Sequence, residues 1–368
     1  MTDTAVITGA DGYLGLKLCL SLLENTEQNL VLWMRADSES EVKSKTSAVT
    51  SLIPAKHTDR VQLTFGNLAF DNCFSQIKDL EAISHVIHTA AVIKFNVEAD
   101  IADQINIAGS KRLFDLCLQL PNLKQLNYIS TIYSSGTVEG QITEAPFENV
   151  AKFVNHYERS KNEAELLLLN EYGHLPWNVL RVATAIADDH TGKVSQYNAV
   201  HNTLRLLYNG LVSLLPGKLD TPLYFVTGDF AAESTRRVVD SSATNQFYHI
   251  STNARESLTL NQLLDQVYNI FSEDEQFVSK RILRPLMVEE AEFAALADNL
   301  EKMSSGIVGD AMSSIAPFAG QLYNNKQVAN DNLQELWGTS YTAPTNSKLV
   351  DTTVRYLVKS KWGREGDL

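Results

Sequence analysis

The stretch TAVITGADGYLG, residues 4–15, decides the fold, because spaced glycines follow a short apolar run and lead into a helical pattern. Gly9 permits a tight turn, Gly12 lets the backbone approach a pyrophosphate, and Gly15 lets the following helix pack closely. The N-terminus of that helix adds N–H groups and partial positive charge. We therefore predict a dinucleotide-binding Rossmann domain. The cofactor contacts expected from this stretch are Thr8, Gly9, Gly12, Tyr13, Leu14 and Gly15.

Short apolar runs alternate with helical patterns through the first half of the chain. Leu, Ile and Phe recur at three- and four-residue spacing in segments 14–24 and 105–120, as in helices that pack on a sheet. Continuous apolar runs are typical of parallel strands covered on both faces. We predict an α/β fold with a doubly wound parallel sheet, whose strands lie at residues 5–7, 30–33, 61–63, 85–88, 126–129 and 179–180.

The alternation fades after about Asp188, and from Leu258 the sequence becomes helical and acidic. This change predicts a smaller, mainly helical part that closes over the carboxyl edge of the sheet and binds the substrate. The expected Rossmann domain covers residues 1–190 and parts of 220–255, and the substrate-binding part covers about 191–220 and 256–368.

The net charge of -13 argues against nucleic acid and anionic membranes as partners, because both require a basic field. No apolar stretch is long enough to span a bilayer and no signal-like segment precedes the first strand, so we expect a cytoplasmic protein. Three cysteines, Cys19, Cys73 and Cys117, lack metal-ligand spacing and are expected to be reduced core residues, with no metal site. An acidic ligand would need local basic groups, for which the candidates are Arg35 with Lys43 and Lys45, Arg236 with Arg237, and Lys280 with Arg281 and Arg284.

Arg35 stands at the end of the second predicted strand, where an acidic residue would accept from the adenosine ribose and repel a phosphate. A guanidinium instead matches phosphate geometry with its planar fork. This position therefore favours NADP(H) over NAD(H).

Tyr157 and Lys161 are one helical turn apart and can serve the same site. A phenol has a pKa of about 10, and a neighbouring ammonium stabilises its anion. Thr131 closes a predicted strand and so brings a hydroxyl to the carboxyl edge of the sheet, where ligands of such sheets bind. His88 lies inside a predicted buried strand and is interpreted as a core histidine.

In their order and separation, the glycine loop, strand-end hydroxyl and Tyr-Lys pair resemble the extended short-chain dehydrogenases/reductases. Several stretches resemble in particular the thioester reductases of polyketide and nonribosomal peptide assembly lines and the fatty acyl reductases. These stretches are Met34-Arg35-Ala36, His88-Thr89-Ala90-Ala91-Val92, Ser130-Thr131, Asn155 to Lys161, and Tyr248-His249-Ile250.

The resemblance implies catalytic roles for Thr131, Tyr157 and Lys161. The chain departs from the family pattern at Asn67, where Asp is usual, and at Val182, where Pro is usual. Beyond the glycine loop, the implied cofactor contacts are Arg35, Asn67, Leu68, Ala90, Ala91, Tyr157, Lys161 and Val182.

The activity implied by the resemblance is reduction of an acyl thioester by NADP(H) to an aldehyde or alcohol, in polyketide, other natural-product or fatty acyl metabolism. The thioester would be delivered in trans by an acyl carrier protein or coenzyme A, with Arg236 and Arg237 as the candidate basic patch for it. A monomer or homodimer is expected. Two alternatives stay open: oxidation or reduction of a free ketone, alcohol or sugar, and NADP(H) binding without turnover.

Overall fold

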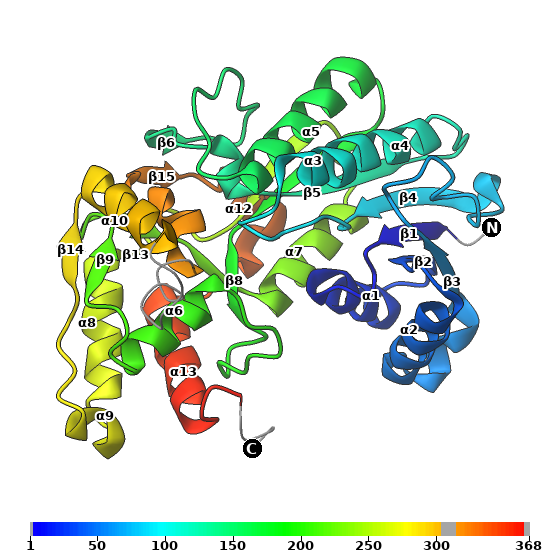
Figure 1. Ribbon diagram of the computed structural model, residues 1–368. Coiled ribbons are helices and arrows are strands. Elements are labelled where there is room, and N and C mark those ends of the chain that lie inside the picture. Colours follow the sequence, from blue (N-terminus) through cyan, green and yellow to red (C-terminus); the bar gives the residue numbers. More distant parts are fainter. Residues whose placement is uncertain (1–2, 303–313, 364–368) are drawn as a thin grey trace.

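The computed structural model describes residues 3–302 and 314–363, and its centre is one seven-stranded parallel sheet (Figure 1). The strand order is β12-β7-β5-β4-β1-β2-β3, so the order reverses between β1 and β4. Six strands confirm the predicted positions, and β12 adds a seventh. The strands are β1 Thr4–Thr8, β2 Asn29–Arg35, β3 Val61–Gly66, β4 Ile83–His88, β5 Gln125–Thr131, β7 Trp177–Val182 and β12 Gln246–Ile250.

Helices cover both faces of this sheet, as the continuous apolar strands predicted. Successive strand residues point to opposite faces, so Ile7 packs in one buried cluster with Leu18 of α1, whereas Val6 packs in another with Phe114 of α4. A π-helical turn, Asp103–Ile107, interrupts the predicted helix 105–120. The covering helices are α1 Tyr13–Asn25, α2 Glu39–Leu52, α3 Ala99–Ala102, α4 Ala108–Cys117, α5 His156–Tyr172, α7 Gly228–Asp240 and α12 Asp331–Trp337.

The C-terminal part is mainly helical and has its own buried cluster, which includes Leu204, Leu264 and Val354. Its helix α8 begins with a capping box, in which Thr259 and Gln262 exchange hydrogen bonds of 2.9 and 3.2 Å. The helices are α6 Ala199–Tyr208, α8 Leu260–Phe271, α9 Glu275–Ser279, α10 Glu290–Lys302, a helix at 314–319, and α13 Asn346–Lys359.

Among the described residues, four short strand pairs lie outside the main sheet, and the sequence pattern did not predict them. The pairs are β6 Gly140–Ile142 with β15 Lys326–Val328, β8 Thr184–Ala187 with β11 Phe225–Thr227, β9 Leu214–Pro216 with β14 Leu286–Val288, and β10 Pro222–Leu223 with β13 Leu258–Thr259. Short 3-10 turns lie at Ala55–Arg60, Leu80–Ala82, Ile132–Ser135, Gly320–Tyr323 and Gly338–Ser340.

The three cysteines are buried and form no disulfide, as expected of core residues. Within residues 3–302 and 314–363, no helix is long and apolar enough to cross a membrane.

Candidate active site

The glycine loop between β1 and α1 fits a bound pyrophosphate. Gly9 has a φ of +68°, and a Cβ added there would meet Ala90 Cα at 2.8 Å. A Cβ on Gly15 would lie 2.2 Å from the Gly9 carbonyl oxygen. Gly12 is the N-cap of α1 and offers no side-chain cap, and the first turn holds no acidic residue. The first N–H groups of α1 are therefore available to an anionic ligand.

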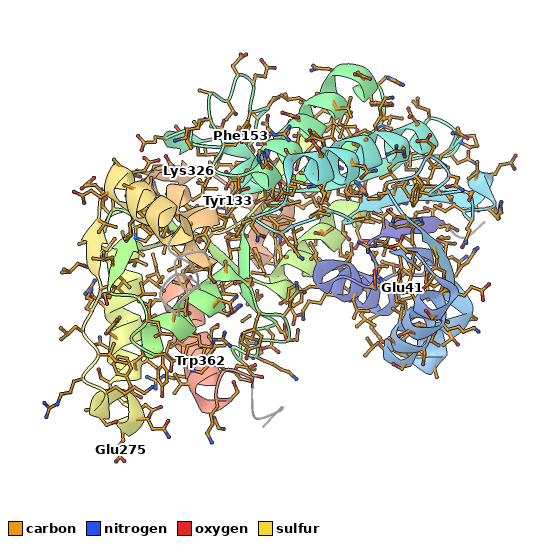
Figure 2. All side chains as sticks on the ribbon, in the orientation of Figure 1. Glu41, Tyr133, Phe153, Glu275, Lys326 and Trp362 are labelled. Carbon is orange, nitrogen blue, oxygen red and sulfur yellow. The ribbon has the colours of Figure 1, made fainter. Side chains whose placement is uncertain are left out.

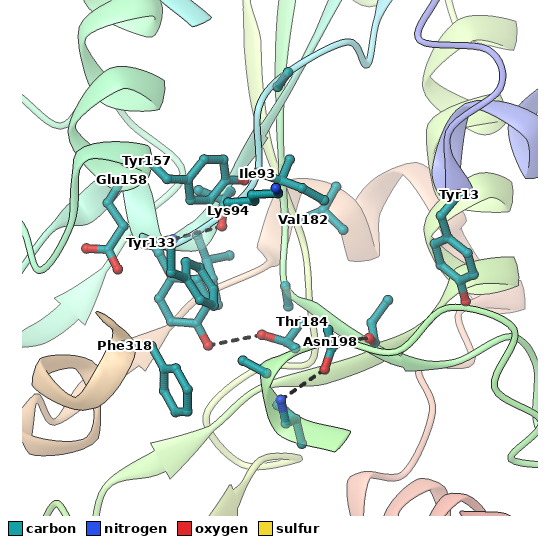
Figure 3. A pocket seen from close by; sticks show the side chains of 18 of the residues that line it. Tyr13, Ile93, Lys94, Tyr133, Tyr157, Glu158, Val182, Thr184, Asn198 and Phe318 are labelled. Atoms are coloured by element: carbon teal, nitrogen blue, oxygen red, sulfur yellow. Dashed lines mark hydrogen bonds between the residues drawn. The ribbon is translucent and has the colours of Figure 1, made fainter. Parts of the chain in front are cut away.

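A cavity of about 1200 Å³ begins at this loop and extends along the carboxyl edge of the sheet into the C-terminal part. It brings together most of the predicted site residues, including Thr131. Figure 3 shows Tyr13, Tyr157 and Val182 among the side chains that line it. The predicted cofactor residues that line it are Gly9, Gly12, Tyr13, Leu14, Gly15, Arg35, Asn67, Leu68, Ala90, Ala91, Tyr157 and Val182.

Thr8 and Lys161 do not line the cavity. Thr8 is fully buried, and its hydroxyl is 2.6 Å from Nδ1 of His88, whose Nε2 lies 3.1 Å from the Ser110 hydroxyl. Burial, with a smaller effect of the Lys161 charge, lowers the pKa of His88 to about 3. His88 is therefore a neutral core residue, as predicted, and Thr8 supports the loop from behind.

A carboxylate that was not predicted from the sequence, that of Asp37, stands beside Arg35 and Asn67. Arg35 is largely exposed at the end of β2, and its Nε donates to Asp37 Oδ2 at 3.1 Å. The other oxygen of Asp37 accepts from Asn67 Nδ2. The arginine that favours a phosphate therefore has a carboxylate beside it.

Thr131 and Tyr157 meet at the middle of the cavity. Thr131 is the last residue of β5, and its Oγ1 accepts from the Tyr133 backbone N–H at 3.3 Å. Burial raises the pKa of Tyr157 above its usual range, and the Glu158 charge adds to this, while the neighbouring Thr131 hydroxyl opposes it. The phenol of Tyr157 is therefore neutral and able to donate a proton.

Lys161 lies behind Tyr157, one turn further along α5. Its side chain is 3% exposed, and Nζ lies 4.0 Å from the centroid of the Tyr128 ring. Burial lowers the pKa of Lys161 to about 7, and the Glu165 carboxylate opposes this shift. The ammonium thus lies in the interior against an aromatic face.

Several cavity residues were absent from the predicted site. Tyr133 follows Thr131, and its hydroxyl lies 3.3 Å from Thr184 Oγ1. Glu158 and Lys326 both line the cavity and are both buried. Burial raises the pKa of Glu158 to about 7 and lowers that of Lys326 to about 8, and the charge of each opposes the shift of the other.

Arg236 and Arg237 do not form the free basic patch that we expected. Both guanidinium groups contact Glu233, at 2.7 and 2.9 Å, and Arg236 also pairs with Asp240. Arg237 additionally stacks on Trp337, at 4.1 Å from the ring centroid. These charges are neutralised on their own helix, because carboxylates stand three and four residues away.

The fold, the glycine loop and the Thr131, Tyr157 and Lys161 arrangement define an extended short-chain dehydrogenase/reductase, a class of NAD(P)-dependent oxidoreductases. Within this class, the chain belongs to the NAD-binding family described as male sterility protein, whose model matches residues 7–235.

Curated relatives match about half of the chain. D-lysergyl-peptide-synthetase subunit 3 of Claviceps purpurea is 24% identical over 211 residues, which cover 53% of this chain and 12% of that protein. A component of the linear gramicidin synthase of Brevibacillus parabrevis is 24% identical over 52% of this chain and 4% of its own length. The fatty acyl-CoA reductase wat of Drosophila melanogaster is 22% identical over 42% of this chain and 35% of its own length. The chain therefore spans only a minor part of these relatives.

Solved structures share the fold along the whole chain. The terminal R domain of the myxalamid PKS-NRPS pathway has a TM-score of 0.77 at 19% identity, and covers 100% of this chain and 93% of its own. A thiolation-reductase di-domain of an archaeal nonribosomal peptide synthetase has a TM-score of 0.72 at 16% identity, and the match covers 98% of this chain and 76% of the di-domain chain. UDP-glucuronic acid 4-epimerase of Bacillus cereus has a TM-score of 0.66 at 16% identity, and the match covers 98% of this chain and 99% of the epimerase chain. At these identities the likeness shows the fold alone.

Proposed function

We propose that the protein reduces an acyl thioester, presented by a carrier protein or coenzyme A, to an aldehyde or alcohol with NADP(H). One observation carries this proposal: a single cavity joins the glycine loop, the Thr131 and Tyr157 hydroxyls, and a chamber within the C-terminal part. In this proposal residues 1–190 with parts of 220–255 hold the cofactor, and about 191–220 with 256–368 hold the substrate.

The chamber suits an apolar acyl chain better than a sugar nucleotide. Of the described residues that line the cavity, only Arg35, Lys94 and Lys326 are cationic. Lys326 is buried, and its ammonium is hydrogen-bonded to Ser135 and Gly136. A sugar nucleotide would require charged and polar partners for its phosphates and hydroxyls. The apolar lining comes from Leu204, Leu207, Leu215, Leu223, Phe225, Leu260, Leu263, Leu264, Phe318 and Leu322.

Tyr157 and Thr131 act on the carbonyl oxygen of the substrate. When bound, the nicotinamide cofactor supplies the hydride that adds to the carbonyl carbon. The two hydroxyls hold the oxygen where negative charge develops, and a donor of this kind contributes about 3 to 4 kcal/mol. Tyr157 gives its proton to that oxygen, and the Lys161 ammonium behind it stabilises the resulting phenolate. The hemithioacetal then loses its thiol to leave the aldehyde.

The cofactor preference for NADP(H) rests on Arg35. Its exposed guanidinium can leave Asp37 and take a ribose phosphate in a bidentate contact. The loop N–H groups of Gly12 and the next residues would hold the pyrophosphate, and Ala90 and Ala91 would line the middle of the cofactor.

Following NADPH absorbance with an acyl-coenzyme A, an acyl carrier protein conjugate and the matching aldehyde tests the proposal. We expect oxidation of NADPH with at least one thioester. Oxidation of NADPH with the aldehyde alone would argue against a thioester substrate and favour a free carbonyl compound. Tight NADPH binding without turnover on any of the three would instead support a binding protein.

A further inference from the structure

Two buried ionisable groups beside Tyr157 have no part in the proton transfer described above. Glu158 is 1% exposed and Lys326 is 4% exposed, and both line the cavity. Lys326 belongs to β15 of the C-terminal part, and its Nζ lies 5.7 Å from the centroid of the Tyr133 ring (Figure 2). Buried charges are costly unless they are paired and hydrogen-bonded, so each partner contact is informative.

Glu158 fixes the first turn of α5, which carries Tyr157. Its carboxylate accepts from Val154 N at 3.1 Å, from Asn155 Nδ2 at 3.1 Å, and from Gln321 Nε2 at 2.8 Å. Asn155 is the N-cap of this helix and in turn accepts from the Glu158 backbone N–H at 2.9 Å. The carboxylate therefore ties the helix start to the C-terminal part.

Lys326 fixes the turn that follows Thr131. Its Nζ donates to Ser135 Oγ at 3.0 Å and to the Gly136 carbonyl oxygen. The same carbonyl accepts from Gln321 Nε2 at 3.2 Å. Ser135 ends the 3-10 turn that begins directly after Thr131. One C-terminal segment, residues 320–328, thus holds the turn after Thr131 and the helix start that carries Tyr157.

We propose that Lys326 and Glu158 form a bridge that positions Tyr157 against Thr131, so that the C-terminal part sets the reaction geometry as well as holding the substrate. As a statement about catalysis, this inference rests on the proposed reduction. Neither residue is a catalytic residue, because each acts through the segment it holds. Without Lys326, the Glu158 carboxylate would remain buried beside the phenol with its counter-charge removed.

A double-mutant cycle separates this role from ordinary packing. We expect Lys326→Met to lower kcat about 30- to 100-fold, with KM changed less than about threefold and the NADPH Kd less than about twofold. Adding Glu158→Gln should restore at least about tenfold of kcat, because the double variant buries no unpaired charge. A loss confined to KM, or a double variant no faster than Lys326→Met, would contradict the bridge.

The pH profile supplies a readout that a purely structural role would not move. The titratable groups around the Glu158 carboxylate are Tyr157 on its own helix, Tyr133 on the 3-10 turn and Lys326 on β15. In Lys326→Met, protonation neutralises Glu158, so kcat relative to wild type should rise as pH falls from about 8 to about 6. A constant ratio would oppose the inference.

The exposed pair Lys56 and Glu24, which is 2.7 Å apart and does not line the cavity, provides the control cycle. Lys56→Met, Glu24→Gln and their double variant should retain wild-type kcat and pH profile.

Crystal structures of the wild type and Lys326→Met test the placement without relying on turnover. We expect Thr131 and Tyr157 to stay together at the cavity in the wild type and to separate in Lys326→Met through a shift of the helix start. An unchanged pair of hydroxyls in Lys326→Met would overturn the inference, whatever the activity. If the wild type is inactive on thioesters and aldehydes, and the two hydroxyls still separate in the variant, the proposed function would be overturned and the positioning role would stand.

Discussion

The ammonium of Lys161 lies 4.0 Å from the centroid of the Tyr128 ring. Tyr128 stands three residues before Thr131, which ends the same strand, β5. Tyr128 is fully buried, and Lys161 is 3% exposed. Burial lowers the pKa of Lys161 to about 7, and the charge of Glu165 opposes this shift. The lysine is therefore held at a cost to the stability of the folded protein.

That cost predicts how stability depends on pH. An unfolded lysine has a pKa of about 10.4, so between about 7 and about 10 the unfolded chain binds more protons than the folded one. The contribution of Lys161 to the free energy of unfolding should therefore rise with pH across this window. Lys161→Met should remove that rise and should be more stable than wild type at pH 6, although inactive. Thermal unfolding of both proteins across the window checks this, and parallel curves would refute it.

Tyr157→Phe tests the proton donor. Removing the hydroxyl should lower kcat about a hundredfold to a thousandfold, because the developing oxyanion loses a positioned donor. The NADPH Kd should change little, since the ring remains. Tyr268→Phe is the matched control, because its hydroxyl bonds the Leu283 carbonyl outside the cavity and should be dispensable. Wild-type turnover by Tyr157→Phe would end the assignment.

The fold was largely predictable because its strands are continuous apolar runs. Strand β12 was not predicted because its sequence, QFYHI, mixes polar and apolar residues after an irregular stretch. The short strands outside the main sheet, of two to four residues, are too brief to show a period. Thr131 and Tyr157 were predictable because strand ends and helix spacing place them locally.

Other site residues carried no local signal. Lys326 reaches the cavity only because β15 pairs with β6, a contact between segments almost 190 residues apart in sequence. Asp37 was missed because a residue two positions beyond the strand turns back toward Arg35. The pairing of Arg236 and Arg237 with Glu233 could have been predicted, because the two arginines stand three and four positions after the glutamate on one helix.

Arg35→Ala tests the cofactor preference. Charge-assisted hydrogen bonds contribute about 1.5 to 3 kcal/mol, so kcat/KM for NADPH should fall about 10- to 150-fold, with little change for NADH. Asp37→Asn should act in the opposite direction, because it removes the carboxylate that competes for Arg35 and would repel a phosphate. Steady-state kinetics with both cofactors measures the ratio. An Arg35→Ala variant that loses NADH and NADPH activity equally would show that Arg35 does not bind the ribose phosphate of NADPH.

Leu223→Trp tests whether the chamber holds the acyl chain. Leu223 is half-buried on β10 and lines the cavity, so a larger ring there fills space that a long chain needs. We expect kcat/KM for long-chain acyl thioesters to fall at least about tenfold relative to short-chain ones, a difference of about 1.4 kcal/mol. Leu219→Trp, at a position 44% exposed and outside the cavity lining, is the control and should keep the wild-type chain-length profile. Equal loss on all chain lengths would place the acyl chain elsewhere, because an occluded chamber must discriminate by length if the substrate enters it.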